Sequence, residues 1–367
     1  MLNYIVARVI QAIPVIFLIA VVSFVLMLQA PGGPQAAFNQ NPRITPAQVD
    51  QWLARWCLER NPDLVGTMRE FGGWLGVWNC EGGGFLSAKG APNFLPEALG
   101  GGDNGIIHGD FGFSIQNGRP VLALIAERIP ATLVLMVTAF VIWVSLAITL
   151  GVLAAVKRYS IFDQAVTLFS YVFYSLPTFW LGLILIYIFA VAWHLLPSQG
   201  IVDTHTAPAA FNSALYWVGF WKNPPPQLFD IGRHLILPVA TLVAISVAGD
   251  SRFVRSSMLE TLSQDYVRTA KAKGLPARTV IFRHAFRNAL LPILTTVSLE
   301  LAFLFSGAIA TETIFSWPGM GRLFFEGVNN RDYFLLMGIL LIGSVLVVLM
   351  NLVADVFYAW ADPRIRY

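Results

Sequence analysis

Pro130 to Val156 reads PATLVLMVTAFVIWVSLAITLGVLAAV, a run without any Asp, Glu, Lys or Arg. A helix needs roughly 20 mostly apolar residues to cross the hydrocarbon core of a bilayer, because lipid offers unsatisfied backbone groups no partner. The run is longer than this minimum. It therefore predicts a transmembrane helix, and this prediction decides the fold class.

Composition and further apolar runs extend the same interpretation to the whole chain. Of the 367 residues, 56% are hydrophobic and only 12% are charged, which is membrane-like usage. In chain order, the six candidate spans are Val9–Ala30, Pro130–Val156, Ala165–Leu195, Leu235–Val254, Ala289–Thr311 and Tyr333–Trp360. We predict an all-α integral membrane protein with six transmembrane helices, the fourth continuing into the cytoplasm through Glu260.

The distribution of Lys and Arg predicts the orientation. Lys157 and Arg158 follow the second run, the densest basic cluster follows the fourth, and Arg364 and Arg366 follow the sixth. Because short cytoplasmic loops carry an excess of Lys and Arg, both termini are predicted to be cytoplasmic in a multi-pass protein of the cell inner membrane. The first run is longer than the apolar part of a signal peptide, so we expect it to be retained.

Three regions follow from this topology. Residues 1–30 are the first transmembrane helix, 31–120 an extracytoplasmic lobe, and 121–367 a core with five transmembrane helices. The only cysteines, Cys57 and Cys80, both fall in the lobe, where an oxidising compartment allows a disulfide between them. Whether they pair is left open by the sequence.

The densest cationic segment, Ser263 to Pro292, reads SQDYVRTAKAKGLPARTVIFRHAFRNALLP and predicts two short helices. Ser263 or Asp265 can cap the first helix, and Gly274 allows positive φ at its end. Val267, Ala270 and Gly274 recur at helical spacing, giving a narrow face that a partner's groove could accept. Binding to anionic lipid is the alternative for such a basic loop.

Motifs along the chain give this segment a context. Arg268, Thr269, Ala270 and Gly274 resemble the coupling loop of permease subunits in bacterial ABC importers, in its dipeptide and oligopeptide branch. Further matches, in order, are APGGP from Ala30, GDFGFSI from Gly109, ERIPATLVL from Glu127, SLPTFWLGL from Ser175, ETIFSWPGMGRL from Glu312 and DVFYAWADPRI from Asp355. Arg268 and Thr269 replace the usual Glu and Ala of the general motif, as is normal in this branch.

The resemblance implies the type I ABC importer permease fold, with a coupling loop within residues 255–290. The residues expected to contact an ATPase are Arg268, Thr269, Ala270, Lys273, Gly274, Leu275, Arg283 and Asn288. It also implies a homologous second permease subunit, two ATPase subunits or domains, an extracytoplasmic solute-binding protein and a peptide substrate, with a nickel chelate or glutathione as alternative solutes. Membrane lipid is a further expected partner, and nucleic acid is not.

The ATP site is expected on other chains. No G-x-x-x-x-G-K-[ST] phosphate loop occurs in the sequence, so ATP and magnesium are assigned to the partner subunits and no cofactor to this chain. The five histidines are scattered without a supporting catalytic motif, which argues against an enzyme. A channel would not need the coupling loop, and a receptor would usually bring a soluble signalling domain.

Candidate residues of the translocation path are Glu300, Pro177 and Phe179. An ionised carboxylate inside a span costs about 2.5 to 3.5 kcal/mol on insertion scales, so Glu300 should face protein or water. It is expected either to meet a peptide amine or another cation in the path, or to pair structurally with a neighbouring subunit. Pro177 removes a helix hydrogen bond and predicts a kink, either a hinge beside the pore or a packing kink. The segment SWPGMGRL after Phe315 predicts an elbow.

Overall fold

The computed structural model describes residues 2–29, 64–75, 106, 109–203, 211, 213–222, 224–302, 304 and 307–361. Within these ranges the regular elements are helices, accompanied by one isolated bridge between Phe113 and Pro120. The all-α prediction is confirmed for this part of the chain. Most of the predicted lobe, with Cys57 and Cys80, lies outside the described residues, so the lobe and the disulfide stay predictions.

Four described helices are long and apolar enough to cross a membrane. They are α1 (Leu2–Gln29), α4 (Val121–Val156), α8 (Pro224–Leu262) and α14 (Tyr333–Ala361). These correspond to the first, second, fourth and sixth predicted runs. The continuation of α8 through Glu260 is confirmed, because this helix ends only at Leu262.

The third predicted run is broken rather than kinked. It forms α5 (Ile161–Ser175) and α6 (Thr178–Leu185), the latter continued by the π-helix η4 (Ile186–Ala192), and the two parts are bent by 102°. Leu176 is extended, with φ −80° and ψ 133°, because a proline disfavours the helical region for the residue before it. Pro177 then stands at the N-cap of α6. The predicted disturbance of the third span at Pro177 is therefore confirmed, as a break between two helices.

The fifth predicted run is also interrupted. Here α11 (Arg287–Ala302) is 16 residues long, and Gly307 and Ala308, just before α12 (Ile309–Ile314), are not helical. Gly307 in this stretch has φ +75°, and a Cβ atom added there would lie 2.7 Å from Glu312 Oε1. Counting the bent pair as one span gives up to five candidate spans in the described residues, so the total of six stays a prediction.

The chain divides into two compact units. The first contains residues 128–322 with both ends of the chain, and the second contains residues 10–127 and 323–345. In the first unit, α4 forms the core with α8, α7 (Ala214–Lys222) and the segment before α13 (Met320–Asn329). Trp317 is fully buried there and donates from Nε1 to the carbonyl of Ala131 at 2.8 Å.

The second unit has its own core. Phe24 of α1 packs against Phe71 and Trp74 of α3 (Leu64–Leu75), with ring centroids 5.4 and 5.5 Å away. Asp332, just before α14, accepts a hydrogen bond from Ser114. Burial raises the pKa of the Asp332 carboxyl, and the Ser114 hydroxyl acts in the opposite direction.

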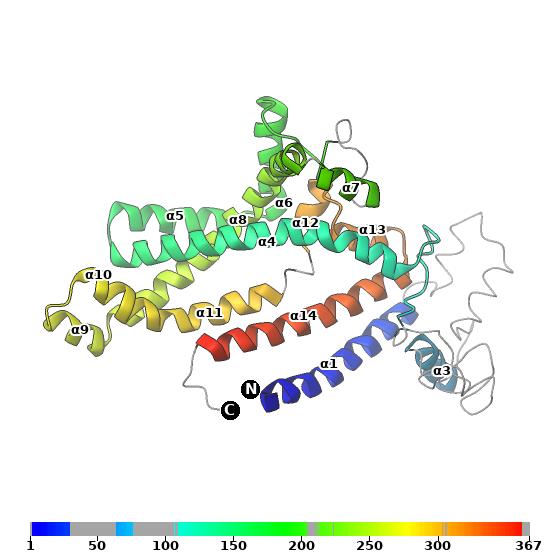
Figure 1. Cartoon of the computed structure of the whole chain (residues 1–367), viewed down its shortest axis with the longest axis horizontal. Coiled ribbons are helices and arrows are strands. Elements are labelled where there is room, and N and C mark those ends of the chain that lie inside the picture. The colour runs from blue at the N-terminus through cyan, green and yellow to red at the C-terminus, as the bar shows by residue number, and fades with distance from the viewer. Residues whose placement is uncertain are drawn as a thin grey trace. The chain divides into compact units, whose positions relative to one another are not determined.

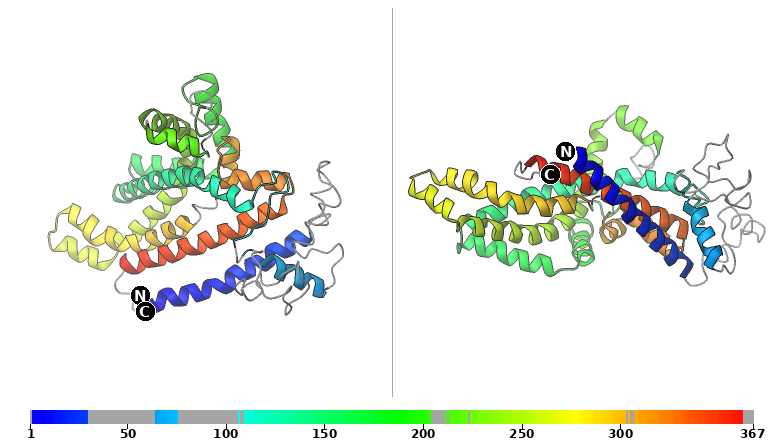
Figure 2. Two further views of the ribbon diagram at one scale, coloured as in Figure 1. Left: turned by 45° about the vertical axis from the view of Figure 1, so that its right-hand side comes forward. Right: turned by 90° about the horizontal axis from the view of Figure 1, so that it is seen from below.

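A helical hairpin joins α8 to α11 in the first unit. It consists of α9 (Asp265–Ala272), the short α10 (Ala277–Thr279) and the π-helix η5 (Val280–Phe286). Figure 1 shows α9 and α10 at the ends of α8 and α11, and the same hairpin stands out in both views of Figure 2. The predicted pair of short helices is confirmed.

Candidate functional site

The turn of the hairpin is built around Gly274. The N–H of Gly274 donates to the carbonyl of Lys271 at 3.0 Å, and that of Leu275 donates to the carbonyl of Ala270 at 3.4 Å. This pair of bonds is the Schellman motif, which needs a left-handed residue at its centre. Gly274 supplies it with φ +73°, and a Cβ atom there would meet nothing within 4 Å. The glycine is therefore required by backbone conformation, as predicted.

The start of α9 differs from the prediction. The N-cap residue is Gln264, and its side chain makes no capping hydrogen bond. Ser263 Oγ instead donates back to the carbonyl of Glu260 at 2.7 Å, and Asp265 is already the first helical residue. The proposed caps at Ser263 and Asp265 are therefore wrong, since Ser263 follows the end of α8 and bonds back to its last turn.

The small-residue face of α9 points into the chain. Val267 is fully buried and Ala270 is 4% exposed, packed with Met258 of α8 and Val280 of η5. An isolated helix of two turns is not stable in water, so α9 depends on packing its one apolar stripe against the rest of the chain. The expectation that a partner's groove accepts Val267 and Ala270 is therefore wrong, whereas Gly274, the third residue of that face, is exposed.

The opposite face of the hairpin is exposed and cationic. Of the residues predicted to contact an ATPase, Ala270 alone is buried. The exposed ones are Arg268, Thr269, Lys273, Gly274, Leu275, Arg283 and Asn288. A rigid turn thus presents a cationic surface while the hairpin is anchored by its apolar side. Contact of these residues with a partner stays a prediction.

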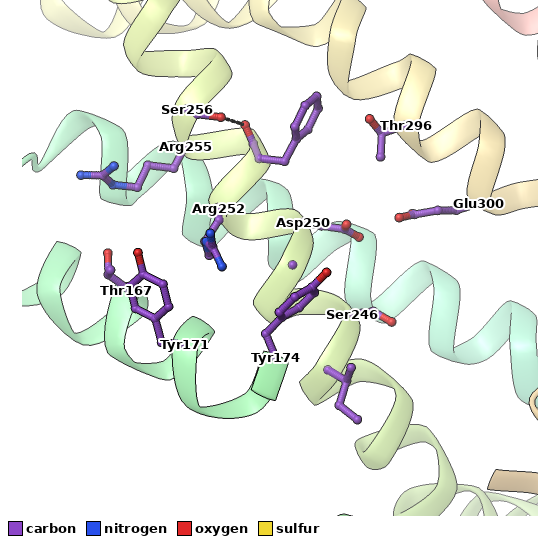
Figure 3. Close-up of a pocket in the computed structure, with 13 residues that line it drawn as sticks. Thr167, Tyr171, Tyr174, Ser246, Asp250, Arg252, Arg255, Ser256, Thr296 and Glu300 are labelled. Carbon is purple, nitrogen blue, oxygen red and sulfur yellow. Dashed lines mark hydrogen bonds between the residues drawn. The ribbon is translucent and has the colours of Figure 1, made fainter. Parts of the chain in front are cut away.

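A second polar feature is a pocket of about 840 Å³ between α5, α8 and α11. Figure 3 shows Asp250 of α8 and Glu300 of α11 pointing toward one another across it. The two carboxyl groups interact, and Glu300 Oε2 is buried without a hydrogen-bond partner in the described structure. Glu300 therefore faces protein and a cavity, as predicted for a carboxyl within a span.

The sequence alone did not reveal Asp250 as the partner of Glu300. The available signal was a carboxylate directly after the uncharged stretch Leu235 to Gly249. Nothing in the sequence connects two residues 50 positions apart on different helices. The other predicted path residues, Pro177 and Phe179, are exposed at the start of α6 and do not line this pocket, so the structure does not bring the three together.

Two arginines one turn apart on α8 have different surroundings. Arg255 forms a double ion pair with Asp163 of α5, Nε to Oδ1 at 2.6 Å and Nη2 to Oδ2 at 2.8 Å. Arg252 instead lies over the rings of Tyr171 at 4.8 Å and Tyr174 at 6.0 Å. Arg255 therefore ties two helices together, whereas Arg252 presents its guanidinium to the pocket (Figure 3).

A buried carboxylate at the predicted elbow was missed by sequence reasoning. Glu312 is fully buried, accepts from Thr132 Oγ1 at 3.0 Å and accepts from the N–H of Arg322 at 3.0 Å. A Cβ atom on Gly319 would overlap with this carboxylate, so glycine is required beside it. The elbow between α12 and α13 is confirmed, and the acidic residue next to the glycine-rich WPGMG was its signal.

The described residues offer no grouping suited to a metal ion. Within those ranges, His, Cys, Asp and Glu side chains do not gather in threes. The carboxyl pair Asp250 and Glu300 is the main polar cluster of the pocket. The chemistry available there is the binding of a small charged group rather than coordination by a full ligand set.

Long apolar helices, a cationic hairpin that prolongs one of them and a polar pocket between helices define a multi-pass membrane protein of the transporter class. The family described as "Binding-protein-dependent transport system inner membrane component" matches residues 147–367, more than half of the chain. The chain therefore belongs to this family of inner-membrane permease subunits.

Named relatives cover most or all of the chain. It is 36% identical over 368 residues, the whole of both chains, to the "Oligopeptide transport system permease protein AppB" of Bacillus subtilis (strain 168). It is 41% identical over 267 residues to the "Dipeptide transport system permease protein DppB" of Escherichia coli (strain K12), covering 72% of this chain and 78% of that one. The "Di/tripeptide transport system permease protein DppB" of Pseudomonas aeruginosa (strain UCBPP-PA14) is 33% identical over 372 residues, 100% of this chain and 99% of the relative.

Proposed function

We propose that this chain is the pore-forming permease of an ATP-driven importer that moves di- or oligopeptides across the cytoplasmic membrane. The names of the three relatives all refer to peptides, and two of these relatives align along the whole chain. The observation that carries the proposal is the hairpin α9–α10–η5. It is anchored inside by Val267 and Ala270 and exposes cations on its outer face.

In this proposal the hairpin docks on an ATPase subunit in the cytoplasm. Arg268, Lys273 and Leu275 are exposed beside the rigid turn and supply charge and apolar surface to the contact. Two ATPase subunits hold ATP and magnesium, a homologous permease completes the pore, and an extracytoplasmic solute-binding protein delivers the peptide. Both termini of the chain are cytoplasmic, in agreement with the basic cluster on the hairpin.

The first test is purification of the tagged chain in mild detergent with its partners identified by mass. The recovered complex is then placed in proteoliposomes with its binding protein, and ATP-dependent uptake of Ala-Ala is measured. Recovery of ATPase subunits and a second permease together with uptake supports the proposal. A chain purified alone, or a complex that imports a nickel chelate or glutathione but not Ala-Ala, contradicts it.

The second test concerns the turn at Gly274. Gly274→Trp forces tryptophan into the left-handed conformation that Gly274 adopts, which costs L-residues roughly 1–2 kcal/mol, and it adds bulk to the exposed face. We expect loss of both ATPase retention and uptake. Gly274→Asn is the matched control, because asparagine tolerates positive φ, and should keep most of both. If the Gly274→Trp variant retained the ATPase subunits and supported full peptide uptake, the hairpin would have no part in coupling.

The third test concerns orientation. A cysteine at Lys273 should react with a membrane-impermeant maleimide only after the cells are opened. Because Cys57 and Cys80 also react if they are free, the labelling of the variant is compared with that of the parent chain carrying the same tag. Labelling of Lys273→Cys in intact cells would place the hairpin outside and contradict the proposed topology.

A further inference from the structure

The pocket between α5, α8 and α11 has the size of a ligand site. Its volume of about 840 Å³ lies within the range of about 300 to 1,000 Å³ that is usual for small-molecule pockets. Tyr171 and Tyr174 of α5 supply aromatic surface on one side. Asp250 and Glu300 supply carboxyl groups on the other side (Figure 3). A solute in this pocket would meet apolar and charged walls together.

Charges of both signs line this pocket without matching each other. Asp250 and Glu300 interact with one another, and in the part of the chain described here neither forms an ion pair with Lys, Arg or His. Two ionised carboxylates side by side repel each other, and either a proton or a bound cation between them relieves that repulsion. Arg252 likewise contacts tyrosine rings rather than a carboxylate among the described residues.

A buried donor beside Glu300 is also unmatched. Trp143 of α4 is only 6% exposed, and its Nε1 has no hydrogen-bond partner among the described residues. The indole nitrogen faces Glu300 without reaching hydrogen-bond geometry. Buried polar groups are normally paired, and Glu300 Oε2 is likewise buried without a partner among the described residues.

The spacing on α8 fits a small zwitterion. Asp250 and Arg252 are two residues apart and point to different sides of the pocket (Figure 3). A single short stretch of one helix therefore presents an acceptor for an ammonium group and a donor for a carboxylate. An extended dipeptide carries its ammonium and its carboxylate about 7 Å apart, one at each end.

We propose that this pocket is a transient binding site for the charged ends of the transported peptide. The peptide ammonium binds between Asp250 and Glu300, and the peptide carboxylate binds the guanidinium of Arg252. Tyr171 and Tyr174 contact the side chains without selecting among them. This assignment rests on the proposed function and adds to it the groups of the solute that the permease itself recognises.

The test uses the complete membrane complex in phosphatidylcholine nanodiscs, without the solute-binding protein, so that only the membrane subunits select the ligand. The photoreactive dipeptide p-benzoylphenylalanyl-alanine is cross-linked to the complex in competition with Ala-Ala, N-acetyl-Ala-Ala or Ala-Ala amide. The variants are Asp250→Asn, Glu300→Gln and Arg252→Gln. Lys222→Gln, which removes an exposed cation at the end of α7 and outside the pocket, is the matched control.

Each pocket variant is expected to lose the ability to distinguish Ala-Ala from one of the two blocked peptides. In the parent and in Lys222→Gln, each blocked peptide should compete about tenfold more weakly than Ala-Ala, as expected for one lost charge-assisted hydrogen bond. Asp250→Asn or Glu300→Gln should reduce only the penalty for N-acetylation. Arg252→Gln should reduce only the penalty for the C-terminal amide. The adducts should map to α5, α8 or α11.

Equal competition by the three peptides in the parent complex would overturn the proposal, whatever the variants do. Adducts confined to other helices would do the same. A fall in labelling when anionic phosphatidylglycerol replaces zwitterionic phosphatidylcholine would assign Arg252 to an anionic lipid headgroup and refute its role. Uptake of Ala-Ala with the binding protein present is measured separately. Uptake without labelling of the pocket refutes this inference alone, and absence of uptake refutes the proposed function.

Discussion

Replacement of Arg255 by glutamine is expected to expose how strongly α5 and α8 depend on one ion pair. The Asp163 side chain is 4% exposed and that of Arg255 is 26% exposed, and two short hydrogen bonds join them. Arg255→Gln leaves a buried carboxylate facing an uncharged amide. Asp163→Asn leaves an arginine that can still turn toward water. The two variants should therefore differ.

The magnitude follows from the burial of Asp163. Removing one partner of a buried ion pair typically destabilises a protein by about 3–5 kcal/mol, mainly because the other charge is left uncompensated. Since Arg255 is partly exposed, we expect about 3 kcal/mol for Arg255→Gln, at the lower end of that range. Adding Asp163→Asn should then recover roughly 1 kcal/mol or more, because no buried charge remains.

Equilibrium unfolding of the purified chain in mixed micelles, titrated with sodium dodecyl sulfate and followed by tryptophan fluorescence, measures these free energies. The control is Arg268→Gln, which breaks the exposed pair with Asp265, 3.5 Å apart, and should leave stability unchanged. Strict additivity of Arg255→Gln and Asp163→Asn, within about 0.5 kcal/mol, would refute the reasoning, because it would show that the two residues do not interact energetically.

Three further predictions concern backbone geometry and packing. Pro177→Ala should keep the 102° bend, since α6 packs on α8 and α12. The variant should lose only about 0.5–1 kcal/mol of stability, because alanine makes the unfolded chain more flexible than proline does. Spin labels on residues 168 and 187 should stay about 18 Å apart, against about 28 Å in a straight helix. Glu312→Ala should cost about 3 kcal/mol by leaving buried donors without an acceptor, and Glu312→Gln less than half of that, in the same unfolding assay. Gly151→Ala should cost about 1–3 kcal/mol, because its Cβ atom would lie 2.6 Å from that of Val254. Gly232→Ala, with open space at the Cβ position, should not destabilise the chain. Equal effects of the two alanines would exclude the close helix contact as the cause.

Local chemistry in the sequence was enough to predict the helices and the hairpin turn. Charge-free runs locate α1, α4, α8 and α14, because the bilayer imposes a minimum length on apolar helices. Gly274 could be assigned to the turn because left-handed backbone strongly favours glycine. These features depend on residues that are close in sequence.

What the sequence could not predict depends on contacts between distant segments. Val267 and Ala270 form a regular apolar stripe whether they face a partner or the core of the same chain, and only packing against Met258 and Val280 decides which. Pro177 indicates a disturbance of the helix, but the 102° angle is set by the helices on which α6 rests. Glu312 could not be recognised as buried until Thr132, far away in the sequence, was placed beside it.

The anchoring of the hairpin has a mechanical consequence. Because α9 packs on α8 through a shared apolar core, a force on α9 acts directly on α8. Helix α8 is 39 residues long, or about 58 Å, so tilting it as a straight rod by about 5° around its middle would displace each end by about 2.5 Å. Asp250 lies on the part of α8 between Pro238 and the hairpin. A push on the hairpin therefore reaches the wall of the pocket through one helical segment without an internal proline.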